Sequence, residues 1–528
     1  MLLSFKHFLS LLSIAQTARA ASAHEWQKRS IYQVLTDRFA RDGGDNTPCD
    51  TGKKQYCGGT WRAMIDRLDY IQGMGFDAVW ISPIVENIED DTDYGQAYHG
   101  YWTKDFYKLN PHFGTEKDLM DLSKALHDRN MFLMVDVVVN HVGAATDPPD
   151  YTSYNPFNSR SQYHPQCWVQ DYTNQTEVEV CWLGDSKVSL VDVNTEDEGV
   201  VRELNSWIGE LVKKYDVDGI RIDTLKHVRK DFWPEFAKSA GVWTVGEVLS
   251  DNVTYTADWS RVIDAVLDYP TWFQLTSAFK ATNGSVASLA GVVTQAQHTF
   301  DGGEACTGSF LENHDQPRFA SLTKDMALIK NAMAWPFIND GVPILYYGQE
   351  QGYEGAGDPD NRESLWNVNY DTSHPLVSHV TTLNKARKAA IAHNDGFVKT
   401  PVKFIQQPDP NAALAVSKPP FLTLLTNVGS KGSTTWQIGG TFAAPVIGEL
   451  VDVFTCRGYR TSEDGHLKVE SEGGMPMVML EKGALDRDGS ICPEVFYGSG
   501  AAATMARRPG GMGVLAASAC LLLLTSWV

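Results

Sequence analysis

Residues 131–139 have the sequence MFLMVDVVV, an apolar run that is interrupted only by Asp136. Such a continuous run is typical of a strand in a parallel sheet that helices cover, because a strand with one wet face would alternate. Seven similar runs follow or precede it, separated by longer amphipathic stretches: 31–35, 78–81, 219–223, 242–247, 262–267, 309–312 and 344–347. This alternation predicts an α/β fold, a closed (β/α)8 TIM barrel with insertions.

The remaining segments differ from this pattern. The long polar connection after the third strand is either a lid or a small inserted domain. After about residue 399, short alternating segments with turn residues predict a C-terminal antiparallel β-sandwich domain. We therefore divide the chain into a signal peptide, a barrel in two parts, an inserted domain, a β domain and a C-terminal signal: 1–20, 21–139 with 193–398, 140–192, 399–498 and 499–528.

The N-terminal segment has the order of a secretory signal peptide. Lys6 precedes the apolar run 8–15, and small residues follow up to Ala20 and Ala23. We expect cleavage after about Ala20 or Ala23 and export from the cell.

The C-terminal segment has the order of a glycolipid (GPI) attachment signal. Small residues at 499–501 are followed by a spacer with Arg507 and Arg508, and then by the apolar run 512–528. A C-terminal transmembrane helix is the alternative, although the run is at the short limit for a span. We expect a secreted, extracellular protein that reaches the plasma membrane or cell wall only through this lipid anchor.

The cysteines agree with an oxidising compartment. Of eight cysteines, six are near neighbours in sequence and make plausible disulfides: Cys49 with Cys57, Cys167 with Cys181, and Cys456 with Cys492. Cys520 lies in the apolar tail, and Cys306 is left over as a buried free thiol or an intermolecular one. Asn174, Asn252 and Asn283 are glycosylation acceptors if they are exposed.

Charge and composition exclude some classes of partner. The net charge of -20 argues against nucleic acid, because nucleic-acid binding needs a basic footprint. The chain has 15 tryptophans and 20 tyrosines, and flat aromatic rings often stack on sugars, although most will be core. The acidic balance suits a neutral substrate or cation binding, and solubility alone explains it equally well. We expect a monomer.

Acidic residues cluster at one predicted rim of the barrel, where several strands end: Asp136, Asp223, Glu247 and Asp315. In barrel enzymes this C-terminal rim holds the active site. Arg221 and His314 would supply positive or hydrogen-bonding partners to the acids. Structure alone does not favour converging buried carboxylates, because unpaired charges are costly to bury. The alternative is that one or two of them, Asp136 above all, cap loops.

Four segments resemble, in order and at plausible spacing, the four sequence regions of the α-amylase family of glycoside hydrolases (family thirteen): Asp136-Val-Val-Val-Asn-His141, Gly219-Ile-Arg-Ile-Asp-Thr-Leu-Lys-His227, Gly246-Glu-Val-Leu249 and Phe310-Leu-Glu-Asn-His-Asp315. The resemblance runs from about Trp26 to Tyr497, and secreted fungal members are the most similar. Residues 98–102, 181–185 and 348–351 strengthen it.

The resemblance implies a role for each acid. Asp223 would be the nucleophile that forms a covalent glycosyl-enzyme, and Glu247 would be the general acid and base. A retaining enzyme needs such a pair roughly 5 Å apart. Asp315 would orient the sugar hydroxyls. Arg221 lies two residues before Asp223 on the same strand face, where its charge would keep Asp223 ionised.

The resemblance also implies substrate contacts. Three histidines would donate hydrogen bonds to sugar hydroxyls: His99, His141 and His314. Tyr101 and Trp102 would stack on sugar rings. Asp358 and Arg362 would hold the sugar on the non-reducing side of the cleaved bond, and Lys226 and His227 would line the leaving-group side. Each histidine could instead be a satisfied core residue.

A calcium site is implied as well. Asn140, Asp192 and His227, with the backbone carbonyl of Glu179, match the family's Ca²⁺ ligands, and oxygen ligands suit this hard cation. The ion would lock the insert to the rim of the barrel. The alternative is a set of solvated loop acids.

Two departures from the family bear on function. The chain lacks the cysteine that relatives have near Ala257, which leaves Cys306 without that partner. Some wall-anchored relatives act as 4-α-glucanotransferases, and several of those depart at the motif histidines, which this chain retains. We therefore expect endo-acting, retaining hydrolysis of α-1,4-glucosidic bonds in starch- or glycogen-type glucans. The alternatives are a 4-α-glucanotransferase that remodels cell-wall α-glucan and an inactive glucan-binding wall protein.

Overall fold

The computed structural model describes residues 21–303, 307–439, 449–463, 465–485, 490–493 and 495. The predicted signal peptide, the lipid-anchor signal and Cys306 lie outside these residues. Within them, no helix has both the length and the apolar character needed to cross a membrane.

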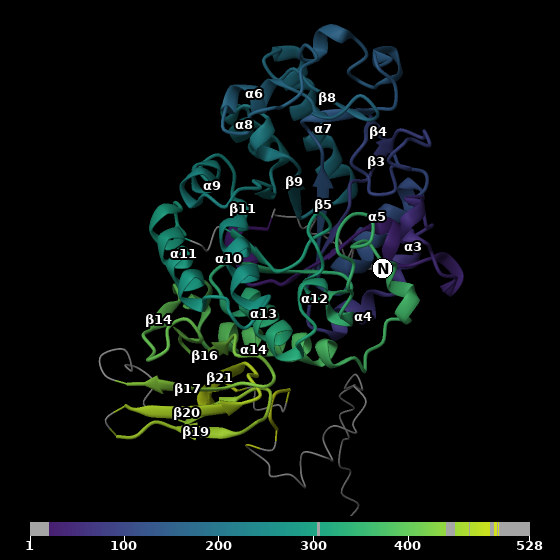
Figure 1. Cartoon of the computed structure of the whole chain (residues 1–528). Coiled ribbons are helices and arrows are strands. Elements are labelled where there is room, and N and C mark those ends of the chain that lie inside the picture. The colour runs from purple at the N-terminus through teal and green to yellow at the C-terminus, as the bar shows by residue number, and fades with distance from the viewer. Residues whose placement is uncertain are drawn as a thin grey trace, which may run out of the picture.

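A closed parallel barrel forms the centre of the molecule (Figure 1). Neighbouring strands follow each other around it in the order β1-β13-β12-β11-β10-β9-β5-β2, and the predicted (β/α)8 barrel is therefore confirmed. Its strands are β1 (Ile31–Val34), β2 (Ala78–Ile81), β5 (Phe132–Val137), β9 (Gly219–Ile222), β10 (Trp243–Gly246), β11 (Ala265–Leu267), β12 (Thr307–Phe310) and β13 (Val342–Tyr346). The run expected at 309–312 begins at Thr307, so Glu312 lies beyond the strand and pairs with Arg318 at 3.2 Å.

Helices alternate with these strands along the chain: α3 (Trp61–Ile65), α4 (Leu68–Gly73), α5 (Glu116–His127), α7 (Glu198–Tyr215), α8 (Trp233–Ala240), α9 (Val253–Trp259), α10 (Tyr269–Phe279), α11 (Val286–Thr299), α12 (Phe319–Leu322), α13 (Met326–Ile338) and α14 (Pro375–His393). In α5, Thr115 and Asp118 form a capping box, and Leu119, Leu122 and Leu126 are buried on one face. Two short helices, α1 (Ala23–Gln27) and α2 (Thr36–Phe39), flank β1.

Two excursions leave the C-terminal rim of the barrel. The first is a hairpin of β3 (Val85–Asn87) and β4 (Thr103–Leu109), which the sequence did not predict. The second is the insert, at the top of Figure 1. Its strands β6 (His141–Ala144), β7 (Leu183–Gly184) and β8 (Ser189–Asp192) form an antiparallel sheet, joined by α6 (Gln175–Val180) and the Cys167–Cys181 disulfide. The long connection is thus a folded unit with its own sheet.

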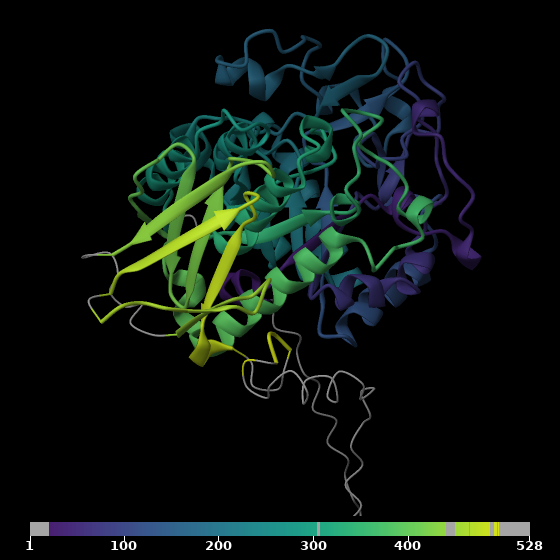
Figure 2. The same ribbon diagram turned by 60° about the horizontal axis from the view of Figure 1, so that its bottom comes forward.

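The C-terminal part is the predicted antiparallel β-sandwich (Figure 2). One sheet has the order β14 (Lys403–Ile405), β15 (Ala413–Lys418), β16 (Phe421–Thr426), β21 (Met477–Glu481), β18 (Glu449–Asp452) and β19 (Gly458–Arg460); β17 (Ser433–Ile438) pairs with β20 (Leu467–Glu472). Leu422, Leu424 and Trp436 belong to one core that both sheets share.

A buried ion pair joins this sandwich to the opposite end of the barrel from the insert. Lys418 donates to Asp340 at 2.6 Å and to the carbonyl of Asn339 at 3.1 Å, just before β13 begins. Helix α13 packs against both β13 and β16. All three predicted disulfides are present, the third of them joining Cys456 and Cys492 in this domain.

Candidate active site

A cavity of about 360 Å³ opens where the barrel strands end. Asp223 and Glu247 directly follow β9 and β10, and Asp315 lies in the loop after β12. This position at the strand ends brings all three predicted catalytic residues into the cavity wall. Seven predicted substrate residues line the same cavity: His99, Tyr101, Trp102, His141, His314, Asp358 and Arg362.

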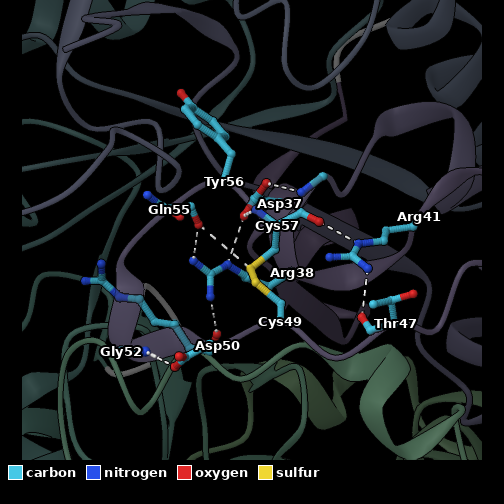
Figure 3. Close-up of a disulfide and its surroundings, with 12 residues drawn as sticks. Asp37, Arg38, Arg41, Thr47, Cys49, Asp50, Gly52, Gln55, Tyr56 and Cys57 are labelled. Carbon is cyan, nitrogen blue, oxygen red and sulfur yellow. Dashed lines mark hydrogen bonds and ion pairs between the residues drawn. A yellow bond between two sulfur atoms is a disulfide. The ribbon is translucent and has the colours of Figure 1, made fainter. Parts of the chain in front are cut away.

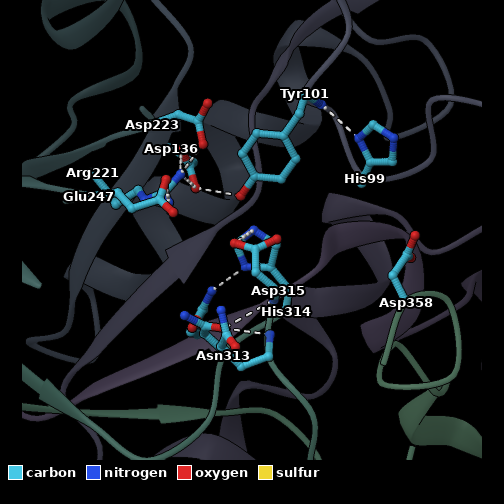
Figure 4. Close-up of polar contacts among 12 residues, drawn as sticks. His99, Tyr101, Asp136, Arg221, Asp223, Glu247, Asn313, His314, Asp315 and Asp358 are labelled. Atoms are coloured by element: carbon cyan, nitrogen blue, oxygen red, sulfur yellow. Dashed lines mark hydrogen bonds and ion pairs between the residues drawn. The ribbon is translucent and has the colours of Figure 1, made fainter. Parts of the chain in front are cut away.

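Arg221, on β9, lies beneath the cavity floor and is only 1% exposed. One of its terminal nitrogens donates to Asp223 at 2.8 Å and to both oxygens of Asp136, and the other donates to Glu247 at 2.8 Å (Figure 4). Because one guanidinium spans only a short distance, Asp223 and Glu247 must lie close together. Asp136 belongs to the same cluster, so it does not serve as a loop cap.

Asp136 also orients an aromatic side chain of the cavity wall. It accepts hydrogen bonds from the Tyr101 hydroxyl at 2.7 Å and from the Trp80 indole at 3.1 Å. The Tyr101 ring stacks on His314, with ring centroids 5.1 Å apart and planes 8° from parallel. The position of Tyr101 is therefore fixed from both ends before any substrate enters.

Burial sets the charges of the groups around this cluster. It raises the pKa of Asp223, against the opposing effect of Arg221, and it raises the pKa of Asp136 to about 6. Burial lowers the pKa of His141 to about 4, and it lowers the pKa of His99 and His314 well below the usual histidine range. These three histidines are neutral at pH 7, so each can donate one ring N–H and accept at the other nitrogen.

Charged residues continue from Asp315 along the cavity. Asp315 lies 3.6 Å from Arg362, which is paired with Asp358 at 3.0 Å. In Figure 4 Asp358 lies on the far side of Tyr101 from Asp223 and Glu247. Asp358 and Arg362 therefore lie in a part of the cavity that is remote from the carboxyl groups of Asp223 and Glu247.

Lys226 and His227 lie on the other side of Glu247. They line a neighbouring cavity of about 450 Å³, which also has Tyr172 and Leu249 in its wall. The Lys226 ammonium donates to the carbonyl of Leu249 at 2.9 Å and lies 5.3 Å from the centre of the Tyr172 ring. Tyr172 was not predicted, because no motif surrounds it in the insert.

The predicted calcium ligands lie where the insert meets the barrel. The pairing of β6 with β8 sets His141 opposite Asp192, and the carbonyl of Asn140 accepts from the Val193 N–H at 2.8 Å. Oδ1 of Asn140 and Oδ2 of Asp192 are buried, and neither has a hydrogen-bond partner. A ring nitrogen of His227 lies 3.1 Å from the carbonyl of Val178, one residue before Glu179.

Such orphaned buried oxygens fit a hard cation, since oxygen ligands are what Ca²⁺ prefers and unpaired buried oxygens are costly otherwise. The donor set is mixed, with amide, carboxylate and carbonyl oxygens. In the part of the chain that the structure describes, no group of three or more His, Cys, Asp and Glu side chains could hold a metal.

Five further residues line the main cavity and were not predicted: Lys54, Tyr94, Tyr98, Leu190 and Thr224. Tyr98 lies inside a segment that carries the family resemblance, and Thr224 follows the proposed nucleophile directly. Lys54 lies between two cysteines that were expected to pair, but nothing in the sequence indicates that their loop reaches the cavity.

Comparisons with known proteins place these features in a family. The model for the α-amylase catalytic domain matches residues 33–422, and that for α-amylase domain C matches 410–495. α-Amylase 2 of Schwanniomyces occidentalis is 43% identical over 92% of this chain and 95% of its own. α-Amylase 1 of Lipomyces kononenkoae is 49% identical over 74% of this chain, which spans 63% of that protein. The solved structure of an α-amylase from Malbranchea cinnamomea is 45% identical, with a TM-score of 0.86 over 89% of this chain and 100% of that one.

Proposed function

The chain belongs to the α-amylase family, and from this premise we propose that it is an endo-acting, retaining hydrolase of α-1,4-glucosidic bonds in starch- or glycogen-type glucans. One observation carries the proposal. The Arg221 guanidinium donates to both Asp223 and Glu247, and both line one cavity beside Asp315. A closely spaced carboxyl pair is what retention of configuration needs.

The proposed reaction has two steps. In the first, an oxygen of Asp223 attacks the anomeric carbon while Glu247 gives its proton to the leaving glycosidic oxygen, which forms a covalent glycosyl-enzyme. In the second, Glu247 takes a proton from water, and that water displaces Asp223 to restore the α configuration. Arg221 favours the ionised form of Asp223 before it attacks in the first step and as it leaves the sugar in the second.

Other residues of the cavity bind and orient the sugar. His99 accepts the Tyr101 N–H at one ring nitrogen and can donate the other N–H to a hydroxyl group. The N–H of His141 faces the Tyr101 carbonyl and that of His314 faces Asp315, so these two would donate to hydroxyl groups when the sugar displaces those contacts. Asp315 would accept from sugar hydroxyls as the ring distorts. Tyr101 presents the ring that Asp136 and His314 hold in place. Trp102 lines the same wall, Asp358 and Arg362 bind the next sugar, and Lys226 and His227 bind the leaving portion.

We propose that Ca²⁺ binds to Asn140, Asp192 and His227, together with the backbone carbonyl of Glu179. The two orphaned oxygens support this assignment. The bound ion would supply a structural cross-link between the insert and the rim, while the proton transfers belong to Asp223 and Glu247.

We also propose that the protein acts outside the cell, held by a lipid anchor. The three disulfides suit an oxidising compartment. The anchor rests on the order of residues in 499–528. Phosphatidylinositol-specific phospholipase C should release the protein from intact cells; protein that stays bound after complete digestion would count against the anchor.

The function is tested by a product time course on pure maltopentaose with protein that lacks 499–528. We expect only shorter products, whose new reducing ends have the α configuration when they are first released. Products longer than maltopentaose would instead assign a 4-α-glucanotransferase, in which sugar outcompetes water for the glycosyl-enzyme. An Asp223→Asn variant is the control, and unchanged turnover in that variant would overturn both enzymatic assignments.

A further inference from the structure

A glutamine lies in the apolar interior of the barrel. Gln33 is the third residue of β1 and shares a strand face with Ile31, which belongs to an apolar cluster drawn from the barrel strands. Its neighbours in register are Trp80 on β2 and Tyr346 on β13, and only 2% of Gln33 is exposed. A buried amide costs free energy unless its polar atoms are hydrogen-bonded, so the choice of glutamine at this position needs an explanation.

The two ends of the Gln33 amide are satisfied unequally. The amide nitrogen lies 2.9 Å from Nδ1 of His314. The amide oxygen, Oε1, is buried and has no hydrogen-bond partner among the residues that the structure describes. Because an unpaired buried oxygen is costly, stability alone would favour an apolar side chain here. The contact with His314 is therefore what a glutamine supplies and an apolar side chain could not.

The contacts of His314 determine which of its ring nitrogens carries the hydrogen. Burial lowers the pKa of His314 well below the usual histidine range, so the ring is neutral at pH 7 and has one N–H. Nε2 lies 3.2 Å from an oxygen of Asp315, and an ionised carboxylate only accepts hydrogen bonds. The hydrogen is therefore on Nε2. Nδ1 is then an acceptor, and the amide N–H of Gln33 is the donor that it needs.

Gln33 also selects the orientation of the His314 ring. The ring stacks on Tyr101, and half a turn about the Cβ–Cγ bond would keep this stacking but put carbon atoms where the two nitrogens are. A contact at the edge of the ring distinguishes the two orientations. Asp315 provides one such contact, but a bound sugar would displace it. The contact with Gln33 lies in the barrel interior and remains when the substrate is bound.

The backbones that carry the two partners are fixed relative to each other. Arg38 lies just beyond β1, is fully buried, and donates to the carbonyls of Gln55 at 2.9 Å and Arg362 at 3.2 Å (the Gln55 contact is visible in Figure 3). Arg362 in turn donates from Nε to the carbonyl of His314 at 3.1 Å. Two guanidinium groups thus connect the end of β1 to the backbone of His314. The distance between Gln33 and the imidazole is therefore set by a rigid frame.

We propose that Gln33 is a positioning residue for the reaction, which fixes His314 as the Nε2–H tautomer and aims this N–H at a hydroxyl of the sugar bound beside Asp315. A donor that is oriented before the substrate enters costs no reorganisation as the sugar ring distorts, so it favours the transition state over the ground state. The inference rests on the proposed function, which it deepens by adding a residue that acts through His314 and not on the substrate itself.

The first test removes the donor. Gln33→Met keeps a side chain of similar length but has no N–H to give to His314. On maltopentaose, kcat should fall about three- to tenfold, the range of one hydrogen bond, while KM changes by less than about twofold. An unchanged kcat, with or without a rise in KM, would overturn the proposal. Thermal unfolding of each variant shows whether it is folded.

A double-mutant cycle separates positioning from packing. His314→Phe keeps a flat ring beside Tyr101 but has no ring nitrogen, so in this background Gln33→Met should lower kcat no further. Equal losses of kcat in the wild-type and His314→Phe backgrounds would mean that Gln33 acts by packing alone, and would overturn the proposal.

The C-terminal sandwich offers a matched control for this cycle. Gln407 is also a buried glutamine, and its amide nitrogen donates to the carbonyls of Ile405 and Gln437 at 3.1 Å each. Gln407→Met should keep kcat in the presence and in the absence of His314→Phe. The same coupling to His314 in Gln407→Met as in Gln33→Met would overturn the proposal.

The tautomer can be measured in the wild-type protein, so the proposal does not depend on the folding of a Gln33 variant. In protein with ¹⁵N in its histidine rings, the signals of His314 are those missing from His314→Phe, or from His314→Gln if the first variant does not fold. We expect the hydrogen on Nε2 at pH 7; a hydrogen on Nδ1, or on both nitrogens, would overturn the proposal. Wild-type protein that fails to cleave maltopentaose would overturn the proposed function instead, and the two failures are therefore distinguishable.

Discussion

Two buried groups of oxygen atoms lie at the same end of the barrel and differ in how their charge is satisfied. Around Arg221, the carboxylates of Asp136, Asp223 and Glu247 all accept from one guanidinium. At Asn140 and Asp192, two buried oxygens have no partner. Burying a polar group without a partner is costly, so the carboxylates of the first group are satisfied by an amino-acid side chain, whereas the orphaned oxygens of the second fit the proposed cation. The group around Arg221 would serve the proposed reaction, and the group at Asn140 and Asp192 would hold the insert against the barrel.

Breaking the first group should have the largest effect. Arg221→Met leaves buried carboxylates without their counter-charge, which should cost about 3–5 kcal/mol of unfolding free energy. Asp223 then takes up a proton more readily, so kcat on maltopentaose should fall by about two orders of magnitude or more. Urea unfolding and initial rates measure the two effects.

Arg318→Met is the matched control for that experiment. Arg318 is also fully buried and pairs with Glu312 and Glu363, but neither of these carboxylates lines the cavity. Arg318→Met should lower the unfolding free energy by a similar amount but lower kcat much less than Arg221→Met does. Equal losses of activity in the two variants would mean that Arg221 has no special place in the reaction.

Breaking the second group should affect stability more than chemistry. If Ca²⁺ is present at 100 times its Kd, complete chelation should remove about 2.7 kcal/mol of unfolding free energy, which added Ca²⁺ restores. Scanning calorimetry with and without chelator measures this shift. The response should vanish in Asp192→Asn and persist in Asp268→Asn, where a buried orphan oxygen lacks the Asn140 neighbour. An unchanged melting temperature in wild-type protein, with no calcium found by elemental analysis, would remove the site.

A smaller effect is expected on the pH dependence of kcat/KM, which tests the coupling between Asp136 and Asp223. The nucleophile must be ionised, so kcat/KM falls as pH drops through the pKa of Asp223, which burial raises. The negative charge of Asp136 raises this pKa further, so Asp136→Asn should lower it and move the acid limb down by about half to one pH unit. Asp268→Asn should leave the limb in place, and a limb that moved upward in Asp136→Asn would contradict the proposed arrangement.

The site residues that directly follow barrel strands could be predicted from the sequence. Asp223 and Glu247 follow continuous apolar strands directly, so the barrel register alone carries them to the cavity. The hairpin was missed because β4 mixes polar and aromatic residues without regular alternation. Lys54 was missed for a different reason. Its position depends on Arg38 bonding to Arg362, which is 324 positions away, and no local pattern records such a contact.

The pairing of Lys418 with Asp340 has a mechanical consequence. The C-terminal sandwich is joined by a buried charge to the base of the barrel, at the end away from the cavity. Separating the two parts would leave a buried ammonium and a buried carboxylate without each other, so the sandwich and the barrel should unfold together. A force applied to the sandwich would then reach the barrel at the end opposite the cavity, away from Asp223 and Glu247.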